Sequence, residues 1–84
     1  MNTMFVLFVS ACMYGSCAWF EITDPHYGSA ESCIQSGQSY AEEMQSIEPR
    51  AYGNIACIPQ EDVEEFRQFI KEKTGSEPQA GKTI

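Results

Sequence analysis

The longest uncharged part of the chain runs from residue 4 to residue 20, and all twelve acidic and five basic residues follow it. Within it, Phe5–Ala11 is apolar at consecutive rather than alternate positions, which predicts a strand that is covered on both faces. Ala18–Thr23 predicts its partner strand, and Gly15 suits the turn between them. An exposed apolar edge would promote aggregation, so we expect the first strand to be central in its sheet or paired across a dimer.

The pattern becomes helical after Gly28. Apolar side chains recur every three or four residues over Ala30–Ile47, Ser29 is the expected N-cap and Pro49 stops the helix. Gln60–Lys73 predicts a second amphipathic helix, with carboxylates at its start, lysines near its end and Gly75 as the residue that ends it.

Asn54–Ile58 predicts a third strand, and Asp24–Gly28 is expected to end the second one because Pro25 offers no backbone donor. The order strand, strand, helix, strand, helix indicates an α+β fold. We expect a three-stranded antiparallel sheet packed on one long helix, with the second helix flanking it. Residues 1–74 are expected to form one domain and residues 75–84 a flexible tail.

The length and net charge of the chain favour some kinds of partner and location and disfavour others. The chain has 84 residues and a formal net charge of −7, which disfavours direct contact with nucleic acid phosphates and favours a protein partner, including one with a basic, nucleic-acid-binding surface. The apolar core of residues 4–9 is short for a secretion signal, and no stretch reaches the roughly 20 apolar residues of a membrane-spanning helix. We therefore expect a cytosolic protein without a membrane segment. A domain this small often needs a staple or a second subunit, so a homodimer is a further expectation.

Four cysteines offer such a staple. Cys12 and Cys17 would face each other across the hairpin turn, and Cys33 and Cys57 would join the first helix to the third strand. Two disulfides are one interpretation, and reduced cysteines buried as small hydrophobic side chains are the other, which a cytosolic location favours. Zinc is disfavoured because only Cys12 and Cys17 approach the spacing of a ligand pair.

No catalytic or cofactor motif is evident. His26 is the only histidine and is expected in an exposed loop, and no cysteine has a positive neighbour that would lower the pKa of its thiol. The glycines are isolated and do not form a phosphate-binding loop. We therefore expect no enzyme activity, no cofactor and no metal.

Carboxylates and aromatic side chains are the candidate partner-binding residues. Acidic helix positions are commonly just solvated polar faces, but exposed Trp and Tyr side chains are favoured interface anchors. The candidates are Glu42, Glu43, Glu61, Asp62, Glu64, Glu65, Tyr14 and Trp19.

Short motifs between about residues 4 and 62 resemble an uncharacterised family of four-cysteine proteins encoded by temperate phages and prophages of enteric bacteria. The motifs are Met4-Phe5-Val6-Leu7 before a cysteine, a glycine-containing turn to Cys17, Tyr27-Gly28-Ser29 with Cys33 following, and Cys57-Ile58-Pro59 with Glu61-Asp62. This chain differs in having longer helices.

The resemblance carries no catalytic residues. It implies a phage or prophage origin, the host cytoplasm, and a protein that binds and disables a host protein stoichiometrically, as anti-defence and anti-CRISPR factors do. The alternative interpretation is a disulfide-stapled structural or exported module without an inhibitory role.

Overall fold

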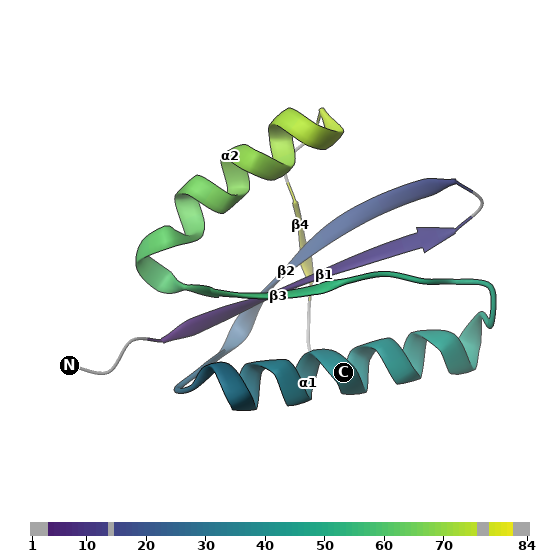
Figure 1. Ribbon diagram of the computed structural model, residues 1–84, viewed down its shortest axis with the longest axis horizontal. Coiled ribbons are helices and arrows are strands. Elements are labelled where there is room, and N and C mark those ends of the chain that lie inside the picture. The colour runs from purple at the N-terminus through teal and green to yellow at the C-terminus, as the bar shows by residue number, and fades with distance from the viewer. Residues whose placement is uncertain (1–3, 14, 76–77, 82–84) are drawn as a thin grey trace.

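The computed structural model describes residues 4–13, 15–75 and 78–81. Two helices enclose a sheet, as the α+β prediction requires (Figure 1). The elements in chain order are β1 Phe5–Met13, β2 Ser16–Tyr27, α1 Ala30–Ile47, β3 Ile55–Pro59, the 3-10 helix η1 Gln60–Asp62, α2 Val63–Thr74 and β4 Gln79–Gly81.

The apolar strand β1 is central in the sheet, whose strand order is β3-β1-β2-β4. β1 pairs antiparallel with both β2 and β3. In the segment that precedes β3, Asn54 O accepts a hydrogen bond from Ser10 N at 2.8 Å, and Tyr52 O accepts one from Cys12 N at 2.7 Å. Because both edges of β1 are occupied, the prediction that two chains dimerise by pairing their first strands is wrong; dimerisation through another surface stays a prediction.

Both faces of β1 are buried, since successive side chains of a strand point to opposite sides. Val6 and Phe8 pack with Val63 and Ile70 of α2. Leu7 and Val9 point to the other side, where they pack with Cys33 of α1 and with Ile22. The sheet therefore lies between α1 and α2 (Figure 1), which explains the consecutive apolar residues of β1.

The helix boundaries follow local signals. α1 spans the predicted Ala30–Ile47, and the Ser29 side chain accepts a hydrogen bond from Ser32 N at 3.1 Å. At the end of α2, Gly75 has φ +81° and donates its N–H to Lys71 O at 2.8 Å. The left-handed conformation at Gly75 confirms it as the residue that ends α2.

The strand β2 is longer than predicted. It continues to Tyr27, which pairs with Phe5, whereas Ile22 pairs with Leu7, so extra β2 residues are accommodated in a register shift between these pairs. An irregularity of this kind tolerates Pro25, because the proline is not required to donate a hydrogen bond there. The strand therefore ends within the predicted stretch Asp24–Gly28, but at Tyr27 and not at Pro25, and His26 lies exposed near the end of β2 rather than in a loop.

The expected C-terminal tail contains a short fourth strand. β4 pairs parallel with β2, with Phe20 opposite Gln79 and Ile22 opposite Gly81. The sheet therefore has one strand more than predicted, and part of the tail contributes it.

Two glycines allow close backbone approach. A Cβ atom at Gly37 of α1 would lie 2.7 Å from Cδ1 of Ile55, so the helix can pack closely on β3 only without that atom. A Cβ atom at Gly53 would overlap the carbonyl oxygen of Ser10. Both contacts fix the position of β3 beside β1 and beneath α1.

Candidate functional site

Four exposed carboxylates gather where η1 leads into α2. Glu61 and Asp62 belong to η1, and Glu64 and Glu65 occupy the first turn of α2, where the helix dipole favours negative charge. Among the described residues the ion pairs are those of Arg67 with Glu21 and with Glu64. Glu61, Asp62 and Glu65 therefore present their charges to solvent.

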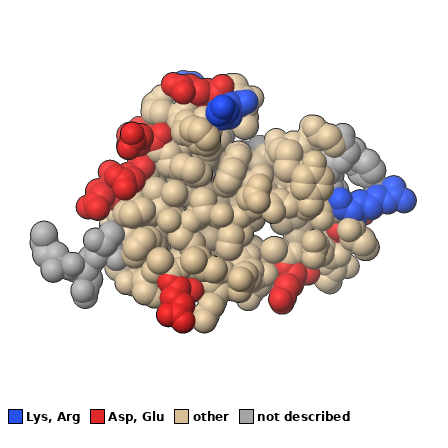
Figure 2. Space-filling model, viewed as in Figure 1, with Lys and Arg blue, Asp and Glu red and all other residues tan. Residues whose placement is uncertain are grey.

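The other two predicted carboxylates, Glu42 and Glu43, are exposed on α1. Because α1 and α2 cover opposite faces of the sheet, the six predicted carboxylates form two separate surfaces (Figure 2). The α2 group holds four of the six and is the denser of the two. A partner that contacts one face of the molecule will meet one of these groups and not both.

Glu21 belongs to the candidate site but is not among the residues predicted from the sequence. Its side chain is 11% exposed and lies on the α2 face of the sheet, opposite Phe8. Arg67 donates to both of its carboxylate oxygens, from Nε to Oε1 and from Nη2 to Oε2, each at 2.7 Å. This bidentate hydrogen bonding, together with the charge of Glu21, raises the pKa of the Arg67 guanidinium.

An open pocket of about 200 Å³ lies beside this pair. Its polar wall comes from β2, η1 and α2 and consists of Glu21, His26, Gln60, Glu61, Glu64 and Arg67. Carboxylates outnumber cations in this lining, so the pocket is suited to a positively charged group. Within the described part of the chain, no group of three or more His, Cys, Asp or Glu side chains is placed to hold a metal ion.

The aromatic candidates differ in their environment. Trp19 is half-buried, and its ring meets Phe66 edge to face with centroids 5.6 Å apart. Phe66 stacks on Phe69, which is 47% exposed and lies 5.7 Å from Lys73 Nζ. Trp19 therefore packs in the core beneath α2, and Phe69 is the more exposed of the two rings. Tyr14 lies outside the residues that the structure describes.

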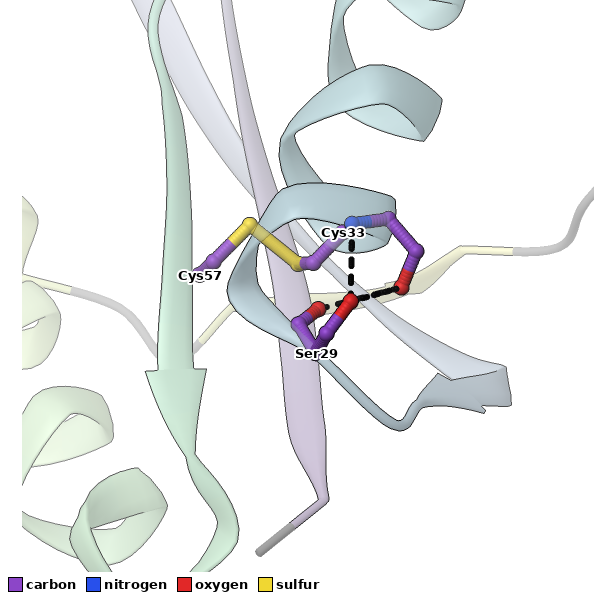
Figure 3. Close-up of a disulfide and its surroundings, with 4 residues drawn as sticks. Ser29, Cys33 and Cys57 are labelled. Carbon is purple, nitrogen blue, oxygen red and sulfur yellow. Dashed lines mark hydrogen bonds between the residues drawn. A yellow bond between two sulfur atoms is a disulfide. The ribbon is translucent and has the colours of Figure 1, made fainter.

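All four cysteines form disulfides, in the pairing expected from the sequence. Cys12 and Cys17 are a cross-strand pair at the hairpin end, with Cα atoms 4.0 Å apart. Cys12 directs its backbone N–H and C=O to Tyr52, so its pair with Cys17 is of the non-hydrogen-bonded type, in which side chains approach most closely. Cys33 joins the first turns of α1, next to the cap Ser29, to Cys57 of β3 (Figure 3).

Comparison with known proteins yields no match to a family model, a curated protein or a solved structure. None of the helices in the described part of the chain has the length and apolar character needed to cross a membrane.

Proposed function

We propose that this chain is a small, non-catalytic binding protein of phage or prophage origin that inhibits a host protein stoichiometrically in the host cytoplasm. One observation carries the proposal: Glu61, Asp62 and Glu65 gather at the start of α2, are exposed and form no ion pair with any residue that the structure describes. Three such carboxylates on one face of a chain with net charge −7 favour encounter with a basic surface. The resemblance to phage-encoded four-cysteine proteins supports an anti-defence role of the anti-CRISPR kind.

Affinity capture with a charge-reversed variant tests this proposal. The tagged protein is expected to retain a host protein from a bacterial lysate and to form a complex of fixed stoichiometry in gel filtration. The variant Glu61→Lys, Asp62→Lys, Glu65→Lys removes the free α2 carboxylates but leaves Glu64, which pairs with Arg67. We expect this variant to lose the partner.

The matched control carries Glu42→Lys and Glu43→Lys on the opposite face of the sheet. It also adds positive charge at exposed helix positions, four units against six in the α2 variant, so it controls for most of the change in net charge, and it should keep the partner. Thermal unfolding establishes that both variants are folded. A partner that the α2 variant retains as well as the parent chain does, or the absence of any specific partner, would refute the proposal.

A second candidate function follows from the cysteines. Both pairs are bonded, and disulfides persist mainly in oxidising compartments. This favours a disulfide-stapled structural or exported module. Mass spectrometry of thiol-blocked protein from the cytosol decides between the two: four free thiols would reject the stapled module, whereas an oxidised form confined to an extracytoplasmic fraction would reject a cytosolic inhibitor.

A further inference from the structure

The strand β3 has one edge that no described strand covers, because it ends the strand order β3-β1-β2-β4. Backbone groups of alternate residues point to the same side of a strand. Asn54 O accepts from Ser10 N, and Gln60 N donates to Met4 O, so the even-numbered residues direct their backbone groups to β1. Ile55 and Cys57 therefore direct their N–H and C=O groups away from the sheet. They offer an added strand two donors and two acceptors.

The flank of α1 nearest this edge carries uncharged side chains, and Glu42, four residues after Gln38, lies at its outer margin. Ala41 and Gln45 line a small hollow of about 60 Å³ together with residues 51–55, so this flank of α1 lies beside the segment that leads into β3. Ile34 and Gln38 precede them at spacings of three and four residues and share the same flank. Ile34 is 43% exposed. An added strand would meet this apolar side chain on one side.

The flank of α2 beside the edge carries acidic and apolar side chains near its start and middle, and Lys73 near its end, over the ring of Phe69. Arg67 faces β2, where it pairs with Glu21. Glu65 and Phe69 are each two residues away from it, and at about 100° per residue they lie on the other flank, away from β2. Figure 1 has β3 in front, and the same view in Figure 2 shows an uncharged centre with both carboxylates and some Lys or Arg side chains at its margins. The open edge thus combines free backbone groups, apolar side chains on the helix flanks and an acidic border, to which Glu65 of α2 belongs.

We infer that the open edge of β3 binds an extended, lysine- or arginine-bearing segment of a protein partner by β-strand addition. Backbone hydrogen bonds to Ile55 and Cys57 hold the segment, its apolar side chains contact the helix flanks and its cations reach the acidic border. Electrostatic repulsion favours a basic segment of a partner over a second copy of this chain. Two copies paired at this edge would bring their acidic borders together, and each chain has a net charge of −7. The inference rests on the proposed function and specifies its binding mode.

Amide hydrogen exchange tests the inference directly. In the free protein, the amides of Ala56 and Ile58 should exchange slowly and those of Ile55 and Cys57 quickly. The probe is a capped seven-residue peptide in which lysine and valine alternate. At 90% occupancy, it should slow exchange at Ile55 and Cys57 about tenfold, because exchange then requires the unbound fraction. A peptide with proline in place of valine has the same charge but cannot add as a strand, and it should give no such protection.

Two single-residue variants test whether the acidic border contributes to peptide binding. Glu65→Lys should weaken binding of the lysine-valine peptide about fivefold. Glu43→Lys makes the same charge change, but Glu43 is two residues from Ala41 and so lies on the far flank of α1. It should bind nearly as the parent chain does. Equal loss in both variants would indicate non-specific attraction and overturn the inference.

Three further outcomes also overturn it. If the peptide binds without protecting Ile55 and Cys57, the site lies elsewhere. If these amides are already protected in the free protein and its mass is that of a dimer, a second copy covers the edge. A captured host protein that requires the α2 carboxylates but leaves both amides unprotected would refute strand addition alone and leave the proposed function standing.

Discussion

At the scale of single residues, Glu21 determines how α2 is held on the sheet. A buried carboxylate is costly unless it is paired, and the planar fork of Arg67 satisfies both of its oxygens at 2.7 Å. The two residues are 46 positions apart in the sequence. The pattern of β2 shows a charge between Phe20 and Ile22, but only the packing of α2 against the sheet reveals its partner.

Gly53 provides a test at the same scale. We expect Gly53→Ala to destabilise the protein by about 1–3 kcal/mol, because the added Cβ would overlap the Ser10 carbonyl oxygen and push the segment before β3 away from β1. Denaturation in urea measures the change. Gly28→Ala is the matched control: no atom lies within 4 Å of its added Cβ, so its effect should stay within about 0.5 kcal/mol. Similar stabilities of the two variants would show that the segment relaxes freely.

At the scale of elements, the disulfides differ in what they join. Cys12–Cys17 closes a hairpin that already has its own ladder, whereas Cys33–Cys57 ties α1 to β3. We expect replacement of Cys33 and Cys57 by serine to cost on the order of 3 kcal/mol, and the same change at Cys12 and Cys17 about 2 kcal/mol, since the longer loop restricts the unfolded chain more. Urea denaturation of the two double variants gives the comparison. A greater loss from the hairpin pair would contradict this ranking.

The same scale shows how far the sequence predicts the fold. The limits of α1 were predictable because Ser29 and Pro49 are local signals, and the disulfide pairing followed from the predicted order of the elements. The extension of β2 and the strand β4 were not predictable, because both depend on pairing with distant residues. Helical periodicity placed the carboxylates on exposed faces, but it does not specify which face of the sheet a helix covers. The sequence therefore gives the acidic candidates as a single group, and the structure divides them between two faces of the molecule.

At the scale of the whole molecule, unpaired negative charge opposes compaction. The chain has a net charge of −7, and in its described part only Arg67 forms ion pairs with carboxylates. Raising the salt concentration from about 0.02 M to about 0.5 M should therefore raise Tm by about 2–6 °C, because salt screens the repulsion. Thermal unfolding by circular dichroism measures this shift. A Tm that falls with salt would mean that the Glu21–Arg67 pair outweighs the general repulsion.

The central position of β1 also determines when the chain can complete its fold. β1 comes first in the sequence, yet the strand on its second edge, β3, begins only at Ile55. During synthesis the hairpin can form early and close Cys12–Cys17. The second edge of β1 remains unpaired until residues 55–59 have been synthesised. Cys33 cannot form its disulfide before the same segment is synthesised, because its partner is Cys57. Until then the nascent chain exposes its most aggregation-prone strand, and the arrival of β3 both covers that edge and creates the open edge of the finished sheet.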